Sequence, residues 1–265
     1  MEQHRIVSRE EWLAAHKAHV AEEKALTHAR DALAAKRRAL PWVKVDKTYT
    51  FDTPDGRKTL ADLFNGRSQL IVYHFMLGPE WEEGCPGCSF LSDHVDGALM
   101  HVEQRDVAYV AVSRAPLARI EAFRKRMGWH FRWVSSYGSD FNFDQHVSFT
   151  PEERSKGKVY YNFDMRDVRE QGFDSDELPG LSVFYKDEAG DVFHTFSAYG
   201  RGLDLLLGAY NLLDLTPKGR DEAHNMMDWL RHHDRYDEVR NGAGAGVTGA
   251  AAAQGATHEA GGCCH

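Results

Sequence analysis

The sequence predicts an α/β fold with a parallel central sheet. Residues 69–77 form a continuous apolar run of strand length, and residues 106–113 form a second one. Uninterrupted apolar strands are typical of parallel sheets, because both faces of such a sheet are covered. Residues 89–102 and 116–127 follow these runs and carry apolar side chains at helical spacing. Strands that alternate with helices in this way indicate βαβ units with right-handed crossovers.

Length and composition are those of an ordinary globular protein. The chain has 265 residues, of which 42% are hydrophobic and 27% charged, and this is enough to bury a substantial core. Its formal net charge of -8 argues against nucleic acid or an anionic membrane as the main partner. No run is long and apolar enough to span a bilayer, and the first residues contain no apolar leader segment. The expected location is therefore the cytoplasm.

The first 40 residues predict a helical arm. Ser8 and Glu11 form a capping box, in which each residue satisfies an orphan N–H group at the start of a helix. An Ala-, Lys-, Glu- and Arg-rich segment follows, with apolar residues seven positions apart at Leu13 and Val20 and at Leu26, Leu33 and Leu40. Such a stripe packs either on the chain's own domain or against a second copy as a homodimer contact.

We expect residues 41–235 to form the main domain. Residues 42–64 should form a β-hairpin around Pro54 and Gly56 and then a short helical turn. The helix at 116–127 should end at Gly128, followed by a short strand at 131–134. The aromatic-rich residues 135–171 form an insertion, which could be either a lid or a packed excursion. Residues 181–196 predict a hairpin, entered through Pro179, and residues 202–215 a helix. Cis prolines occur at tight, specified turns, and one at this point would present a backbone edge to the cysteine pair discussed next.

The candidate site is the pair Cys85 and Cys88, which we place at the first turn of the helix after the strand at 69–77. Unpaired N–H groups and the helix dipole stabilise a thiolate there, so we expect the pKa of Cys85 to be lowered and Cys85 to be the attacking sulfur. Glu80, Glu82 and Glu83 lie just upstream and oppose this effect. A CxxC also serves as half of a zinc site or as two inert cysteines, but the chain has no second CxxC to complete four thiolates.

The C-terminal region carries weaker signals. Residues 231–235, Arg-His-His-Asp-Arg, predict a solvated face, with a metal cluster as the alternative. Residues 241–265 form a Gly/Ala-rich tail that ends in Cys263, Cys264 and His265. This end is either disordered or a thiol hook for a soft metal such as Cu(I) or Zn.

Seven motifs resemble a known family, the bacterial domain of unknown function 899, predicted dithiol-disulfide oxidoreductases with a thioredoxin-like fold in its peroxiredoxin-like elaboration. They are Gly84 to Leu91, Asp93 to Gly97, Ala111 to Leu117, Met127 to Trp129, Ser136 to Phe141, Leu178 to Gly180 with Val183 to Tyr185, and Asp214 to Arg220. The resemblance implies that Cys85 attacks, that Cys88 resolves and that Pro179 is the substrate-facing cis proline. The inner dipeptide is the reverse of thioredoxin's Gly-Pro, and Gly84 replaces its usual Trp; Glu82 stands where peroxiredoxins have Thr.

Three functions remain open on the sequence. The first is an enzyme that exchanges Cys85 and Cys88 with a thiol or disulfide substrate and needs no cofactor. The second is a copper- or zinc-binding protein that uses these sulfurs with His74, His94 or His194, and perhaps with the terminal Cys-Cys-His. The third is a redox-silent binding module that shares the fold without its chemistry.

Overall fold

The computed structural model describes residues 4–170, 175–222 and 226–236, and the chain divides into two compact units, Met1–Val43 and Lys44–His265. The first unit holds the long helix α1 (Arg9–Arg38), which begins at Ser8 with the predicted capping box. Ser8 accepts a hydrogen bond from the amide of Glu11, and the Glu11 carboxylate accepts one from the amide of Ser8. None of the residues of α1 is buried, and Leu26 and Leu33 are 60% and 58% exposed.

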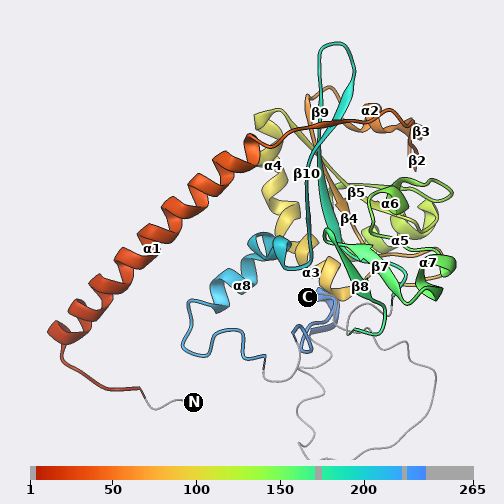
Figure 1. Ribbon diagram of the computed structural model, residues 1–265. Helices are drawn as coiled ribbons and strands as arrows, with labels where there is room; N and C mark the ends of the chain where they lie inside the picture. The colour runs from red at the N-terminus through yellow and green to blue at the C-terminus, as the bar shows by residue number, and fades with distance from the viewer. Residues whose placement is uncertain (1–3, 171–174, 223–225, 237–265) are drawn as a thin grey trace, which may run out of the picture. The chain divides into compact units, whose positions relative to one another are not determined.

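The second unit is built on an eight-stranded mixed sheet in the order β1-β10-β9-β4-β5-β6-β2-β3 (Figure 1). Its strands are β1 (Val43–Lys44), β2 (Thr50–Thr53), β3 (Gly56–Thr59), β4 (Gln69–His74), β5 (Val107–Ser113), β6 (Arg132–Ser135), β9 (Gly180–Lys186) and β10 (Val192–Tyr199). The central strands β4, β5 and β6 are parallel, as predicted, and β9 pairs antiparallel with β4 and with β10. The predicted hairpins at β2–β3 and β9–β10 are confirmed.

Alternating residues of β4 face two separate apolar cores, because successive side chains of a strand point to opposite faces of the sheet. Leu70 and Val72 belong to the core that also contains Phe51 and Phe184. Tyr73 belongs to the core on the opposite face, which contains both cysteines of the CxxC pair. The sheet therefore gives the cysteines an apolar, buried surrounding on one of its faces only.

Helices connect the parallel strands β4, β5 and β6, and another helix follows the β9–β10 hairpin. The helices of this unit are α2 (Leu60–Leu63), α3 (Pro86–Val95), α4 (Leu99–Val102), α5 (Leu117–Met127), α6 (Phe141–Asp144), α7 (Pro151–Ser155) and α8 (Gly208–Leu213), with 3-10 turns at Asp96–Ala98, Glu103–Arg105, Gly200–Leu206 and His233–Arg235. Helix α5 ends at Gly128, whose φ of 67° is the left-handed conformation that glycine adopts readily. This is the end that the sequence predicts for α5.

Two predicted helices are broken in the structure. The segment at 89–102 changes to a 3-10 turn at Asp96, whose carboxylate accepts hydrogen bonds from the amides of His130 and Phe131 instead of facing solvent. The segment at 202–215 begins as a 3-10 turn and becomes α8 only at Gly208. The ring of His94 lies against Gly208, and its Nε2 accepts a hydrogen bond from the amide of Ala209. Tertiary hydrogen bonds thus override helical periodicity at both places.

The insertion at 135–171 has its own structure, as expected, and packs rather than projecting freely. It contains α6, α7 and the hairpin of β7 (Lys158–Tyr161) and β8 (Asp164–Asp167). Its apolar residues form a third small core with Leu178 and Tyr199. The insertion therefore supports the turn that leads into β9, next to the cysteine site.

Candidate active site

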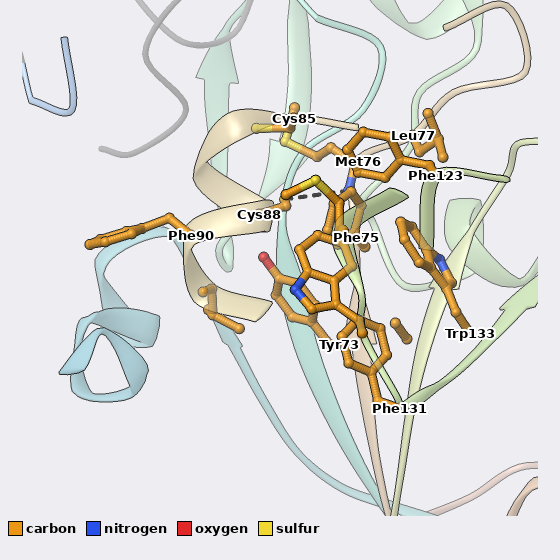
Figure 2. Close-up of a cluster of buried hydrophobic side chains, with 14 of the residues drawn as sticks. Tyr73, Phe75, Met76, Leu77, Cys85, Cys88, Phe90, Phe123, Phe131 and Trp133 are labelled. Carbon is orange, nitrogen blue, oxygen red and sulfur yellow. Dashed lines mark hydrogen bonds between the residues drawn. The ribbon is translucent and has the colours of Figure 1, made fainter. Parts of the chain in front are cut away.

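Both cysteines lie where β4 passes into α3, the position that the sequence predicts. Cys85 is the N-cap residue of α3, and Pro86 occupies the first helical position, where a missing N–H leaves no bond unmade. Met76, just past β4, contacts both cysteines through its backbone: its carbonyl accepts a hydrogen bond from the amide of Cys85 at 3.0 Å. Its own amide donates to Sγ of Cys88 at 3.4 Å (Figure 2). A single residue, Met76, thus holds both cysteines in position through its backbone.

The two thiols are reduced rather than joined in a disulfide, and they are buried and in contact with each other. Cys85 is 6% exposed and Cys88 is 1% exposed. Burial raises the pKa of the Cys88 thiol well above its ordinary value, and a hydrogen bond to Cys85 raises it further. A hydrogen bond that raises the pKa of Cys88 is one in which the Cys88 thiol donates to the Cys85 sulfur. Cys88 is therefore the protonated partner of the pair, which leaves Cys85 as the candidate for the sulfur that reacts first.

Two tyrosines of the sheet share the buried core of Cys88, and Figure 2 shows the first of them, Tyr73, beside the cysteine pair. Tyr73 of β4 lines the same cavity as Cys88, and its hydroxyl is hydrogen-bonded to the Cys88 sulfur. Burial raises the pKa of Tyr73 well above its ordinary value, so this hydroxyl stays protonated and donates. The hydroxyl of Tyr109 on β5 is buried and has no hydrogen-bond partner among the described residues. Periodicity alone could not single out either tyrosine, because both fit the pattern of core residues.

Pro179 lies at the site, but not in the conformation expected from the sequence. It borders a cavity of about 20 Å³ together with Gly87 and Cys88, a volume sufficient for about one water molecule. The expected cis peptide bond is wrong, since none of the described residues has one. The hydroxyl of Tyr161, on the insertion, donates to the carbonyl of Pro179 at 2.7 Å and accepts a hydrogen bond from the amide of Gly200. This hydroxyl anchors the turn that the sequence assigned to a cis bond.

A buried ion pair supports the same turn. Arg114, which follows β5, donates to the carboxylate of Glu177 at 2.5 Å and to that of Asp176 at 3.2 Å. The hydroxyl of Ser148 donates to Glu177 at 2.6 Å. Burial raises the pKa of Glu177 to about 7, against the opposing effects of Arg114 and Ser148. The segment before Pro179 is thus attached to the end of a central strand through a group that titrates near neutral pH.

Residues 226–236 pack over the start of α3, and we call them the C-terminal strap. Leu230 is 4% exposed and belongs to the same core as the cysteines. His232 is equally buried, and its Nε2 donates to the carbonyl of Gly84 at 2.8 Å. The prediction of a solvated face at 231–235 is therefore wrong for His232. The charged composition of this stretch conceals the alternation by which single residues turn inward.

The structure separates the histidines of the metal alternative from the cysteines. His74 hydrogen-bonds to Ser182 and contacts Phe141 in the core on the opposite face of the sheet, and His194 contacts Phe184 in the same core. His94 is engaged through both ring nitrogens, with the carbonyl of Phe90 and the amide of Ala209. Within the described parts of the chain, no three His, Cys, Asp or Glu residues are arranged to hold a metal ion. The terminal Cys263, Cys264 and His265 lie outside the described residues.

Fold and site together define a class: thioredoxin-like α/β proteins with a dithiol at the start of the helix that follows the first central strand. The fold class predicted from the sequence is confirmed. The chain belongs to the family described as "Bacterial protein of unknown function (DUF899)", whose family model matches residues 1–236. Membership of this family is thus also confirmed. No curated protein matches the chain.

Several solved structures are similar at low identity. A cysteine-to-serine mutant of Xanthomonas campestris peroxiredoxin Q is 13% identical with a TM-score of 0.38, over 62% of this chain and 90% of that one. A cysteine-to-serine mutant of Xylella fastidiosa PrxQ is 12% identical with a TM-score of 0.37, over 62% and 88% of the two chains. Peroxidoxin BcpB from Mycobacterium tuberculosis is 12% identical with a TM-score of 0.36, over 66% and 97%. In the part of the chain that the structure describes, no helix has the length and apolar character needed to cross a membrane.

Proposed function

We propose that the protein is a thiol–disulfide oxidoreductase that uses Cys85 and Cys88 on a disulfide substrate. The observation that carries the proposal is the pair itself: two reduced thiols in contact at a helix start, with Cys85 at the N-cap and Cys88 as the protonated partner. The N-terminal end of the helix stabilises negative charge on the first sulfur. The backbone amide of Met76 and the hydroxyl of Tyr73 donate to the second. No cofactor is needed, because the sulfur atoms themselves carry the electrons.

The reaction proceeds in two exchanges. The Cys85 thiolate attacks one sulfur of the substrate disulfide; its S–S bond breaks, a mixed disulfide with Cys85 forms, and the other substrate sulfur leaves as a thiolate that takes up a proton. Cys88 then loses its proton and attacks Sγ of Cys85, which releases the second substrate thiolate. The dithiol has lost two electrons and two protons, and the substrate disulfide has gained them. A dithiol reductant that reverses the exchange regenerates the free pair.

The test is best done in a Cys263→Ser, Cys264→Ser background, in which only the two motif thiols remain. We expect Cys88→Ser to accumulate a mixed disulfide with a model disulfide such as cystamine, and Cys85→Ser to form none, as read by intact-protein mass spectrometry. The parent background is the control, and it should oxidise to an internal disulfide with the loss of two hydrogens. A parent protein that stays fully reduced while cystamine is in excess would refute the proposal.

The metal-binding alternative has less support in the structure, because the described residues offer the two sulfurs no third ligand. It makes a different prediction for the same preparation. Stoichiometric zinc or copper on the purified protein, lost when Cys85 is changed to Ser, would favour metal binding over exchange. We expect metal well below one equivalent.

We also propose a homodimer through α1. This helix of 30 residues has no buried residue, although its stripe includes Leu26 and Leu33 and continues to Leu40, which are 60%, 58% and 46% exposed. Isolated helices gain most of their stability from packing an apolar face. A second copy of the same stripe supplies such a face.

A further inference from the structure

The C-terminal strap covers the site where a substrate has to bind. Met227 and Cys85 lie on the same side of Gly87: a Cβ built on this glycine would meet Sδ of Met227 at 3.5 Å and Sγ of Cys85 at 3.7 Å. Leu230 fills the adjacent part of the core, and Trp229 contacts the ring of Phe90 on α3 edge to face. The cavity left beside Cys88 has room for about one water molecule. A disulfide substrate therefore reaches Cys85 only when the strap moves aside.

Polar groups attach the strap to the loop that precedes Cys85 and to α3. The Glu83 carboxylate pairs with Arg235 of the strap and with Arg126 of α5. Burial tends to raise the pKa of Glu83, but hydrogen bonds from the two arginines outweigh this effect and lower it, so the group is ionised. Nδ1 of His233 donates to the carboxylate of Asp93 at 2.7 Å. Both contacts place a basic side chain of the strap on a carboxylate of the site.

The strap also places one acidic side chain on a basic residue of α5, and it donates one hydrogen bond to the backbone of the loop before Cys85. Asp234 pairs with Arg126 at 2.8 Å. His232 donates to the carbonyl of Gly84, the residue directly before Cys85. A segment that follows the strap's path thus needs an apolar side chain where Leu230 lies and a donor to a backbone carbonyl. It also needs basic groups where His233 and Arg235 lie, on either side of the acidic position of Asp234. These requirements describe a polypeptide, because a small molecule cannot reach all of these points at once.

We propose that the surface beneath the strap is the substrate-binding surface, and that it takes a disulfide-bonded polypeptide with an apolar residue followed by basic residues. The inference rests on the proposed exchange function and specifies its substrate class. The strap occupies the surface in the resting protein and is displaced when such a segment binds. Anionic disulfides are poor substrates, since Glu83 keeps Arg126 but loses Arg235, and Asp93 loses His233, when the strap leaves; Glu80 and Glu82 lie on the same loop.

The first experiment measures how well the strap covers Cys85, with no exchange chemistry involved. Iodoacetamide, which is small and neutral, should alkylate Cys85 about fivefold faster in Arg235→Gln than in the wild type, the factor that corresponds to about 1 kcal/mol. Arg231→Gln is the matched control: it removes the same charge from the strap, and the Arg231 guanidinium donates to the carbonyls of Asp228 and Leu230 of the strap itself. Leu230→Asp, which places a charge in the apolar contact, should accelerate alkylation further. Equal rates in all four proteins would overturn the inference.

The second experiment compares substrates of opposite charge. Two symmetrical peptide disulfides are used, which differ only in carrying arginines or glutamates after a leucine, together with oxidised glutathione and the small cationic disulfide cystamine. We expect kcat/KM to be at least about tenfold higher for the arginine peptide than for the glutamate peptide or oxidised glutathione, and this ratio to fall in Glu83→Gln. Equal values for the two peptides overturn the inference but leave the exchange function standing. No reaction with any of the four disulfides overturns both.

Discussion

Adding a single methyl group at Gly84 tests the packing around the residue that precedes Cys85. A Cβ on Gly84 would lie 2.6 Å from Cε1 of Phe75 and 2.7 Å from Cε1 of Phe123, and both rings are buried. Overpacking of a well-packed core costs about 1–3 kcal/mol. The reduced freedom of the unfolded chain returns about 0.4–1 kcal/mol, because the Gly84 backbone is not in the left-handed region. The midpoints of these two ranges predict that Gly84→Ala lowers the free energy of unfolding by about 1.3 kcal/mol.

Urea denaturation of the wild type, Gly84→Ala and the control Gly97→Ala measures this effect. Gly97 lies in a 3-10 turn, and its Cβ would meet nothing within 4 Å, so alanine there should stabilise the protein by about 0.5–1 kcal/mol. The two substitutions thus act in opposite directions. A Gly84→Ala protein as stable as the wild type would show that the Phe75 and Phe123 rings do not close over this position, and the packing argument would fail.

Three further predictions concern the second thiol, the turn before β9 and the arm. Tyr73→Phe removes a hydrogen bond to Cys88, so it should raise the pKa of the Cys88 thiol and slow the attack of Cys88 on the mixed disulfide, as followed by stopped-flow release of substrate thiol. The control is Tyr109→Phe, which removes a buried hydroxyl without a described partner and should leave that rate unchanged. Because the pKa of Glu177 is raised to about 7 in the folded protein, the protonated carboxyl favours folding, and this contribution to stability is lost as the pH rises from about 4.5 through 7. Urea unfolding at each pH should show a smaller loss of stability over this range in Glu177→Gln than in the wild type. Leu26→Glu with Leu33→Glu should convert a dimer to a monomer in analytical ultracentrifugation, and a wild-type protein that is already monomeric would contradict the dimer proposal.

The sequence predicts the central layer of this protein well, because burial on both faces of a parallel strand leaves a clear apolar run. The CxxC pair can be placed for the same reason: it follows such a run and opens an amphipathic helix. Capping boxes and a left-handed glycine mark helix ends through local chemistry, so Ser8 and Gly128 are also predictable. These signals depend on residues that are close in the sequence, so the prediction is good wherever such residues determine the local structure.

The remaining parts of the site depend on contacts between residues far apart in the sequence. His232 is 148 positions from the carbonyl that it binds, and nothing in a charged Arg-His-His-Asp-Arg stretch marks its second residue as buried. The distance of His74 from the cysteines has a simpler cause: alternate residues of a strand face opposite cores, and its neighbour Tyr73 is the one that faces the cysteines. The alternation of β4 alone is enough to predict this separation.

The hydroxyl of Tyr161 joins two loops that would otherwise be independent, since it holds the carbonyl of Pro179 and the amide of Gly200 at the same time. Both loops border the cavity beside Cys88, whereas the tyrosine comes from an inserted hairpin outside the central sheet. A change in the length of that hairpin would shift both borders together and leave helix α3, which carries the thiols, untouched. A change confined to this peripheral hairpin would therefore alter the shape of the cavity beside Cys88.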